Sequence, residues 1–416
     1  MLTNNHTNGR DAQGRSIHRL PALFLTVVVL LIAALGPQPS TMAAAAPHLS
    51  ARTPAPGYTA PVRQISGYTP TPTPQPAYTP TPIWIDSDTG VDDAVALAVL
   101  LRSPAVQIRG ISSVAGNTTA ENATRNILTL LEVAGRTTVP VVYGADAPLV
   151  FPLSRVGNLL HGPDGLWMAQ RPRDLSGLPR DAAGAICAEA RRTPHLTLLT
   201  LGPLTNLALA TRSCPADLAQ ITVVALGGAK LGGNRTPVAE TNIFIDPQAA
   251  SEVLHARLRL TLITLDAFNQ LKFDSRLVVP AFQQSRDPLF RFLAAPVGTY
   301  ANVQGQGQTI FTIPDLVAAL YVINPSLATP KQSLVVVNTD DSLWRGSTIV
   351  AIEGEMVSVI ASDVELSQLA VRAFSEPNFD LAVELARIMA RTSANAKVVL
   401  TLGSQESMQL FDSMVQ

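Results

Sequence analysis

The sequence predicts an α/β fold in which a mainly parallel sheet is flanked by helices. From Ile83 onward, short apolar runs alternate with helical patterns, which is typical of βαβ units. The runs are apolar almost throughout, as expected for strands that are covered on both faces. Polar clusters follow several runs, and in such sheets ligands bind beyond the carboxyl ends of the strands.

The apolar runs and the helical patterns define the individual elements. The predicted strands cover residues 82–85, 106–114, 139–144, 195–202, 221–228 and 259–266. The predicted helices cover residues 92–103, 120–135, 181–192 and 204–212. The first helix has acidic residues in its first turn, where the helix dipole favours them. The second ends at Gly135, a typical C-terminal residue.

The first 82 residues are expected to lie outside this fold. Residues 1–46 read as an export signal or a membrane anchor, because arginines precede the apolar run at 20–36. As a helix this run would span roughly 25 Å, against about 30 Å for a bilayer core. The Thr/Pro-rich residues 47–82 favour an extended, disordered linker. The protein is therefore expected to be secreted or extracytoplasmic, with a membrane tether as the alternative to a cleaved signal.

The composition of the chain limits the classes of function that it can have. The chain has 416 residues, 47% of them hydrophobic, which is enough for one large core. Its 30 basic and 31 acidic residues give a formal net charge of −1. Nothing in that balance suggests a nucleic-acid surface, which would need a clustered basic face, so nucleic acid is not an expected partner.

The cysteines are Cys187 and Cys214. An exported chain could pair them. Cys187, however, lies in a predicted amphipathic helix, where a buried free thiol is common. We therefore expect free thiols rather than a disulfide.

The segment "IDSDTGVDDA", residues 85–94, concentrates acidic side chains. It contains Asp86, Asp88, Asp92 and Asp93. No lysine or arginine lies between Arg63 and Arg102. Like charges this close raise one another's pKa or require a cation. The alternative for the last two aspartates is a purely structural role as first-turn acids.

The chain resembles the inosine/uridine-preferring nucleoside hydrolase family from about Ile83 to about Arg391. The resemblance rests on "DSDTGVDDAVAL" (86–97), "AGN" (115–117), "HGPDGL" (161–166), "LGPLTNLALA" (201–210), "GGNRTPVAETNIFIDPQAA" (232–250) and "PDLVAAL" (314–320). It implies a catalytic domain at 83–394 that hydrolyses the N-glycosidic bond of ribonucleosides to free base and ribose. It also implies one tightly held calcium ion. Residues 395–416 are a C-terminal extension for which the sequence predicts no role.

The resemblance assigns roles to individual residues. Calcium would be bound by Asp88, Asp93, Asp315 and the backbone carbonyl of Leu201, and oxygen ligands of this kind suit calcium. Asp88 would also be the general base that activates water. The ribose hydroxyls would be held by Asp92, Asn117, Asn234, Glu240 and Asn242, and His161 would line the base pocket. Structural alternatives are that Asp315 and Asn242 only cap helices or turns.

Two positions depart from the family pattern. Many members carry a histidine before the last calcium aspartate as general acid for the departing base. This chain has Pro314 there, and proline carries no proton to donate. Many members also have phenylalanine where this chain has Thr241. We therefore expect weak activity that favours purine nucleosides, with the base stacked on one of three aromatic residues: Trp167, Tyr300 or Phe311.

Two other functions stay open from the sequence. One is a calcium-dependent nucleoside- or ribose-binding protein that has lost turnover. The other follows from "IWIDSDTG", which is similar to the first motif of haloacid-dehalogenase-type phosphatases, with Asp86 as nucleophile. Gly90 does not fit that motif, which has Thr or Val at this position. The nucleoside hydrolase resemblance also implies a homodimer or homotetramer, although the sequence shows no interface.

Overall fold

The computed structural model describes residues 79–415. Its contacts divide this part of the chain into two units. Residues 79–362 and 382–415 form the larger unit, and residues 363–381 belong to the smaller one. The predicted export signal and nearly all of the predicted linker lie outside the described residues. Within the described part, every helix is too short or too polar to cross a bilayer.

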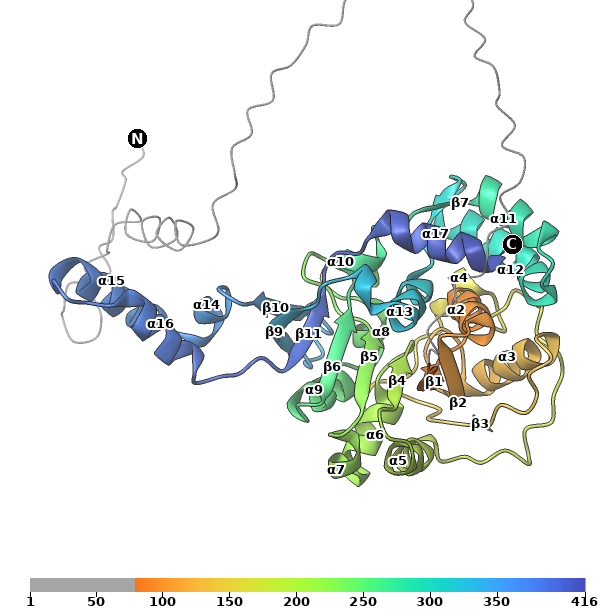
Figure 1. The fold of residues 1–416 in the computed structure, drawn as a ribbon, viewed down its shortest axis with the longest axis horizontal. Helices are drawn as coiled ribbons and strands as arrows, with labels where there is room; N and C mark the ends of the chain where they lie inside the picture. Colours follow the sequence, from red (N-terminus) through yellow and green to blue (C-terminus); the bar gives the residue numbers. More distant parts are fainter. Residues whose placement is uncertain (1–78, 416) are drawn as a thin grey trace, which may run out of the picture. The chain divides into compact units, whose positions relative to one another are not determined.

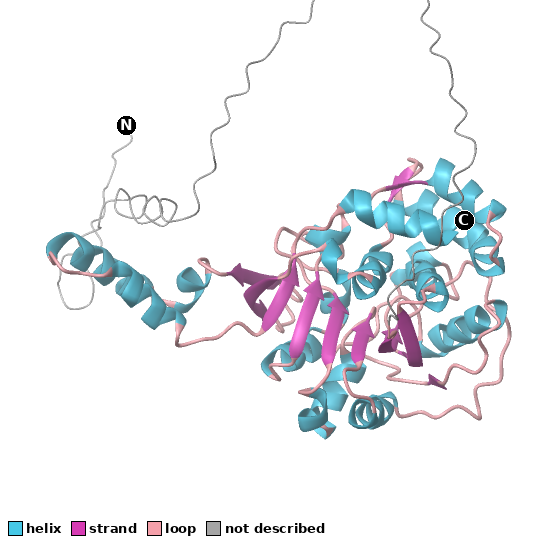
Figure 2. Cartoon of the chain, in the orientation of Figure 1, coloured by secondary structure: helices cyan, strands magenta, loops and turns pink. Residues whose placement is uncertain are grey.

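A nine-stranded sheet forms the centre of the larger unit (Figures 1 and 2). Its strand order is β10-β9-β11-β6-β5-β4-β1-β2-β3. The seven strands from β11 to β3 run parallel, whereas β9 is antiparallel to β11 and β10 is antiparallel to β9. The strands are β1 (Thr81–Ser87), β2 (Val106–Ser113), β3 (Val141–Val142), β4 (Thr197–Thr200), β5 (Thr222–Leu226), β6 (Arg259–Ile263), β9 (Lys331–Val337), β10 (Thr348–Ile352) and β11 (Ala396–Val399). The prediction of a mainly parallel sheet flanked by helices is confirmed.

The predicted helices are present with small shifts at their ends. They are α2 (Val91–Arg102), α3 (Ala120–Val133), α5 (Ala182–Arg192) and α6 (Thr205–Ser213). The remaining helices of the described chain are α4 (Gly157–His161), α7 (Pro215–Leu218), α8 (Thr241–Ile245), α9 (Pro247–His255), α10 (Leu265–Phe268), α11 (Ser275–Gln284), α12 (Pro288–Gln304), α13 (Pro314–Ile323), α14 (Met356–Ile360), α15 (Asp363–Ser375), α16 (Leu381–Met389), α17 (Ser404–Val415) and the short 3₁₀ helix Pro325–Leu327. A two-stranded ribbon pairs β7 (Phe273–Asp274) with β8 (Ile310–Phe311).

The predicted strand at 139–144 is shorter than expected. Of residues 139–144, the two residues of β3 are the ones that pair with β2 at the edge of the sheet. Beyond it, the backbone N–H of Tyr143 donates to the carbonyl of Pro179, and that of Ala145 donates to the side chain of Asn206. The backbone therefore leaves the sheet because other groups satisfy its hydrogen bonds.

Helices cover both faces of the sheet (Figure 2). Strand β1 shows why, because its side chains alternate between the faces. Ile83 and Ile85 are buried in the core that contains α2 and α13, whereas Trp84 is buried in the core that contains α5 and α6. An apolar strand of this kind needs cover on both sides, as the sequence predicted.

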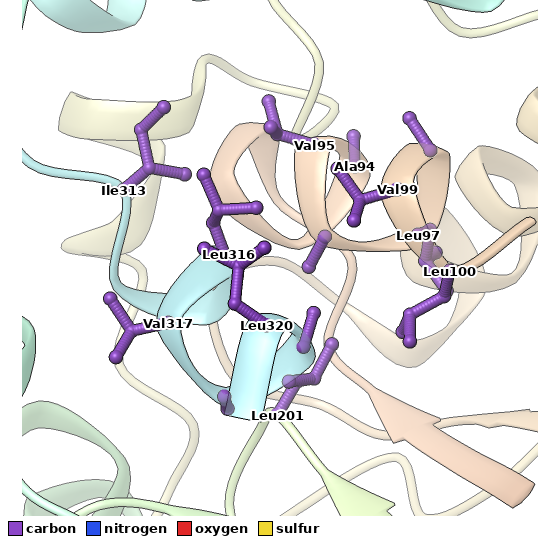
Figure 3. Close-up of a cluster of buried hydrophobic side chains, with 14 of the residues drawn as sticks. Ala94, Val95, Leu97, Val99, Leu100, Leu201, Ile313, Leu316, Val317 and Leu320 are labelled. Carbon is purple, nitrogen blue, oxygen red and sulfur yellow. The ribbon is translucent and has the colours of Figure 1, made fainter. Parts of the chain in front are cut away.

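Helices α2 and α13 pack against each other at one face of the sheet. Figure 3 shows apolar side chains of both helices, including Val99 and Leu320, in one cluster with Leu201. Fully burying a side chain of this size stabilises the fold by about 1.5–3 kcal/mol. This packing brings the N-termini of the two helices together, and these N-termini carry Asp93 and Asp315.

The structure corrects the expectation of free thiols. Cys187 of α5 and Cys214, which ends α6, form a disulfide. The two helices precede and follow β4 and pack against each other, so their cysteines meet although they are 27 residues apart in sequence. Helical periodicity identified α5 correctly, but it carries no information on which side chain lies opposite Cys187.

Residues 395–415 take part in the fold of the larger unit. Strand β11 lies between β6 and β9 in the sheet. Phe411 and Val415 of α17 are buried in the same core as α2 and α13.

Candidate functional site

A cavity of about 480 Å³ lies over the carboxyl ends of the central strands. Its wall includes eight of the predicted site residues: Asp92, Asn117, His161, Leu201, Asn234, Glu240, Asn242 and Asp315. Asp88 and Asp93 are not on the wall but are fully buried at the end of β1 and the start of α2. The topology thus brings together side chains from most of the predicted motifs.

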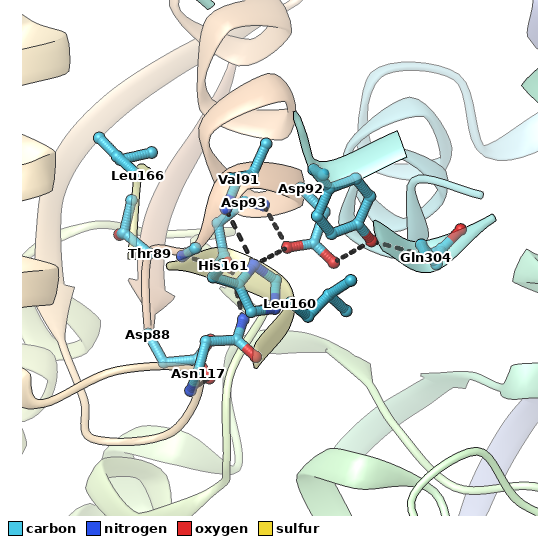
Figure 4. Close-up of polar contacts among 12 residues, drawn as sticks. Asp88, Thr89, Val91, Asp92, Asp93, Asn117, Leu160, His161, Leu166 and Gln304 are labelled. Atoms are coloured by element: carbon cyan, nitrogen blue, oxygen red, sulfur yellow. Dashed lines mark hydrogen bonds and ion pairs between the residues drawn. The ribbon is translucent and has the colours of Figure 1, made fainter. Parts of the chain in front are cut away.

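Asp88 and Asp93 are held by short hydrogen bonds at the β1–α2 turn (Figure 4). Oδ2 of Asp88 accepts from the backbone N–H of Asn117 at 2.6 Å. Oδ1 of Asp93 accepts from Ser87 Oγ at 2.6 Å. Its Oδ2 accepts from the N–H of Gly90 and from Asn117 Nδ2, each at 3.0 Å. Both carboxylates therefore have fixed positions before any ligand binds.

Glycines are required where the backbone approaches the Asp88 carboxylate. A Cβ atom on Gly116 would lie 2.0 Å from Asp88 Oδ2. A Cβ atom on Gly202 would lie 2.8 Å from Asp88 Oδ1. The glycines of "AGN" and "LGPLTN" are thus explained by the space that this carboxylate occupies.

The acidic cluster can hold a metal ion. Asp92, Asp93 and Asp315 each present a carboxylate oxygen, and these three oxygens lie within 4.8 Å of one another. Buried oxygens of Asp88 and Asp315, Oδ1 in each, have no hydrogen-bond donor. Buried acceptors are nearly always paired in native proteins, so these oxygens are available to a cation. The cluster brings Asp92, predicted to bind the sugar, together with two predicted metal ligands, Asp93 and Asp315.

The predicted carbonyl ligand already has one partner. The backbone oxygen of Leu201 accepts from Asn242 Nδ2 at 2.6 Å. A carbonyl oxygen has two lone pairs, so the second can still face a cation.

Burial raises the pKa of the clustered carboxyls. The pKa of Asp93 rises to about 6, first through burial and then through repulsion from Asp92. The pKa values of Asp88 and Asp315 rise well above the usual range, again through burial first and then through the charge of Asp93. A bound cation acts in the opposite direction, because it favours the ionised form of each ligand.

Asp86 belongs to a structural network that the sequence did not predict. Its Oδ1 accepts from Ser112 Oγ and, at 2.8 Å, from Asn206 Nδ2. Burial raises its pKa to about 7, although these two donors lower it. Asp86 is fully buried and does not line the cavity. The phosphatase alternative required Asp86 as a nucleophile, whereas the hydrogen bonds from Ser112 and Asn206 give this carboxylate a structural role.

His161 and Tyr300 both line the cavity, and Figure 4 shows His161 beside Asp92. His161 Nδ1 accepts from the N–H of Val91 at 3.2 Å, so the ring proton of the neutral form is on Nε2. Burial lowers the pKa of His161 and keeps the ring neutral. Tyr300 stacks obliquely on this ring at 5.5 Å between centroids, and its hydroxyl donates to Asp92 Oδ2 at 3.2 Å. Gln304 Nε2 in turn donates to the Tyr300 hydroxyl at 2.8 Å.

The sequence analysis considered Tyr300 only as a stacking surface. Its hydrogen bond to Asp92 joins residues 208 positions apart, and no sequence spacing signals it. Phe311 also lines the cavity, whereas Trp167 does not. The indole N–H of Trp167 donates instead to the carbonyl of Leu160 at 2.9 Å.

Glu240 caps helix α8 and lines the cavity at the same time. Its carboxylate accepts from the N–H groups of Gly228, Asn242 and Ile243 at 3.0–3.1 Å. Asn242 Nδ2 also donates to the carbonyl of Leu226 at 3.1 Å. Glu240 thus has a capping role that the sequence analysis did not predict, and this role is compatible with a second one at the cavity.

Asn234 and Thr241 are joined at the rim of the cavity. Asn234 Oδ1 accepts from both the N–H and the hydroxyl of Thr241, each at 3.0 Å. Pro314 is the first residue of α13 and also lines the cavity, directly before Asp315. The position that carries a histidine in many nucleoside hydrolases thus faces the cavity without a proton donor.

Comparisons with known proteins agree with this arrangement. Residues 83–402 match the family model described as inosine-uridine preferring nucleoside hydrolase. An Escherichia coli protein, "Non-specific ribonucleoside hydrolase RihC", is 34% identical over 279 residues, which cover 65% of this chain and 88% of that protein.

Two solved structures have a similar fold. "Plant nucleoside hydrolase - PpNRh1 enzyme" is 25% identical with a TM-score of 0.67, covering 81% of this chain and 99% of that one. "Purine-Preferring Ribonucleoside Hydrolase from Gardnerella vaginalis" is 22% identical with a TM-score of 0.64, covering 80% and 98%. With the family match over most of the folded chain, these findings show that the chain belongs to the inosine-uridine preferring nucleoside hydrolase family.

Proposed function

We propose that this nucleoside hydrolase uses calcium and favours purine ribosides. The observation that carries the proposal is the pair of unpartnered buried oxygens on Asp88 and Asp315, next to a cavity of about 480 Å³. A buried cluster of carboxylates with a carbonyl nearby is the oxygen-only donor set that suits calcium. Family membership supports hydrolysis of the N-glycosidic bond.

In this proposal the chain's own residues divide the work. A bound calcium ion would supply positive charge that acidifies water. Asp88 accepts the proton of the attacking water, since its free oxygen is fixed by the hydrogen bond from Asn117 to the other one. Asp92 and the amide and carboxylate groups of the cavity wall hold the ribose hydroxyls.

The leaving base would depart toward Tyr300 and Phe311, which line the cavity. Pro314 cannot protonate it, and general acid catalysis contributes about 10²–10⁴-fold where it is present. A purine can be protonated by solvent at N7 while it stacks on an aromatic ring, whereas uracil departs poorly without a donor. This reasoning supports the purine preference.

Export is the proposed location, and the disulfide between Cys187 and Cys214 supports it. Disulfides persist in oxidising compartments and are rare in the cytosol. The membrane tether and the dimeric or tetrameric state stay predictions from the sequence and the family.

The test compares kcat/KM for nitrophenyl riboside, inosine and uridine on one calcium-loaded preparation. Nitrophenolate leaves without an acid, so we expect the order nitrophenyl riboside, inosine, uridine. The Asp88→Asn variant should lose about 10²–10⁴-fold on all three, because it lacks the base. Uridine cleavage as fast as that of the nitrophenyl substrate would show that another residue supplies the acid. Nucleoside binding without any cleavage would identify the binding-protein alternative.

A further inference from the structure

Arg235 lines the same cavity and differs in charge from the carboxylates and amides around it. It follows Asn234 in the loop between β5 and α8 and is partly exposed at the rim. Its Nη2 donates to Ser154 Oγ at 2.8 Å. The ion pairs formed within residues 79–415 do not include Arg235. A guanidinium group has five N–H donors, so most of its donors stay available to a ligand.

The guanidinium group is held in place from behind. Its Cζ lies 5.1 Å from the centre of the Phe244 ring. The same ring is contacted by Arg345 at 4.4 Å, and Arg345 also stacks on Phe151 at 3.6 Å. Arg345 Nη2 donates to the carbonyl of Phe244 at 3.1 Å. A positioned cation loses less conformational entropy when it binds an anion than a free one does.

The floor of the cavity has the opposite charge. It presents the carboxylates of Asp92, Glu240 and Asp315, all of them buried. Carboxylates accept hydrogen bonds from sugar hydroxyls, whereas a guanidinium group matches the oxygens of a phosphate in a bidentate manner. The cavity therefore suits a ligand with hydroxyls on one part and an anion on another.

The geometry of a riboside connects these two parts. Its base is attached at C1′ and its 5′ group at C4′, on either side of the ring oxygen. We place the base against Tyr300 and Phe311 and the 5′ group against Arg235 and Ser154, which line the same cavity and are joined by a hydrogen bond. We infer that Arg235 and Ser154 form a binding site for the 5′-phosphate, so that nucleoside 5′-monophosphates are substrates. This inference rests on the proposed function.

Lys272 provides a matched control in the same cavity. It is an exposed cation on the cavity lining. It directly precedes Phe273, which pairs with Phe311 of the aromatic wall. A general attraction of anions would involve both cations, whereas a 5′-phosphate site would depend on Arg235.

The experiment measures kcat/KM for inosine and inosine 5′-monophosphate with the full chain and its Arg235→Gln, Arg235→Lys and Lys272→Gln variants. The wild type should cleave the monophosphate at least as well as inosine. Arg235→Gln should lower the ratio of monophosphate to inosine about 10-fold or more, as expected for a charge-assisted hydrogen bond. Arg235→Lys should keep part of that ratio, and Lys272→Gln should change it less than about 3-fold.

Two outcomes would overturn the inference. One is a wild type that prefers inosine by about 10-fold or more. The other is an equal loss in Arg235→Gln and Lys272→Gln, which would show general attraction only. Calorimetric binding of ribose 5-phosphate against ribose to the wild type separates this site from hydrolysis. Tighter binding of the phosphate supports the site even if inosine is not cleaved, and equal binding rejects it even if inosine is cleaved.

Discussion

The floor and the rim of the cavity are built in different ways. Asp88 and Asp93 lie beneath the floor and are fully buried, and Asp315 on the floor is 3% exposed. The first two are fixed by backbone N–H groups and neighbouring side chains. At the rim, Asn234 and Thr241 are held chiefly by each other. A displaced floor carboxylate has no alternative position, whereas a displaced rim side chain has solvent as a partner.

This difference separates chemistry from selectivity. The floor contains the groups that would bind the ion and activate water, and its glycines leave no space for change. The rim contains Thr241 and Arg235, where this chain can vary without disturbing the aspartates. We therefore expect perturbations of the floor to have large effects on stability and rate, and perturbations of the rim to have small effects that depend on the substrate.

The largest effect is expected from pH and metal together. Carboxyls whose folded pKa is raised stabilise the metal-free fold below their unfolded pKa and lose that contribution as pH rises through the folded value. For Asp93 this pH window runs from about 4 to about 6. For Asp86 it runs from about 4 to about 7. Within its window, each carboxyl lowers the free energy of unfolding by roughly 1.4 kcal/mol per pH unit. The metal-free melting temperature should therefore fall from pH 5 to pH 8.

Calcium should oppose this loss, because it favours the ionised ligands. At 100 times its dissociation constant at pH 5 it adds about 2.7 kcal/mol to the free energy of unfolding, and the same concentration adds more at pH 8, where the ionised ligands lower the dissociation constant. Thermal unfolding with chelator, calcium or magnesium at both pH values measures this. Identical melting curves with chelator and with calcium would show that the cluster does not bind the ion.

The next effect concerns the glycine beside the general base. Gly116→Ala places a Cβ atom 2.0 Å from Asp88 Oδ2, so the carboxylate must move. A displacement of about 1 Å can lower the rate about 10²-fold, and we expect this loss in kcat/KM for inosine. Gly177→Ala is the control, because its Cβ atom would have no neighbour within 4 Å. Equal activity of the two variants would show that Asp88 need not be held where it is.

The smallest effect is expected at the rim. Thr241→Val removes the hydroxyl that donates to Asn234 Oδ1 and leaves the backbone N–H donor in place. A net loss of about 0.5–1.5 kcal/mol corresponds to a change in kcat/KM of roughly 2- to 13-fold. Thr241→Ser keeps the hydroxyl and should behave like the wild type. A loss of kcat/KM as large as that of Gly116→Ala would show that Thr241 contributes to the rate as much as the residues of the floor do.

The floor could be predicted from the sequence because its residues belong to short motifs at the ends of strands. Asp88, Asp93 and Asp315 were named in this way, and the helix that carries Asp93 was predicted at residues 92–103, whereas α13, which carries Asp315, was not predicted. Contacts between distant side chains could not be predicted. The hydrogen bond from Tyr300 to Asp92 and the disulfide from Cys187 to Cys214 both depend on how helices pack, and periodicity identifies a buried face without identifying its neighbour.

Hydrogen bonding bears on a competing interpretation. The sequence alone left Asp86 open as a nucleophile because "IWIDSDTG" is similar to the first motif of haloacid-dehalogenase-type phosphatases. In the fold it lies on the same face of β1 as Trp84, whose indole N–H donates to Ser112 Oγ at 3.0 Å. Ser112 in turn donates to Asp86. The sequence contained this signal, because side chains two residues apart on a strand point to the same face of the sheet, as those of Trp84 and Asp86 do.

The position of β11 has a consequence for the order in which the molecule can assemble. Residues 396–399 form the last strand of the chain, yet they lie inside the sheet, and β9 and β10 are connected to β6 only through them. The hairpin of β9 and β10 therefore has no place in the sheet until the C-terminus has been synthesised. Completion of the sheet is therefore a late event, and the N-terminal half of the chain must wait for its last strand before the sheet can close over β9 and β10.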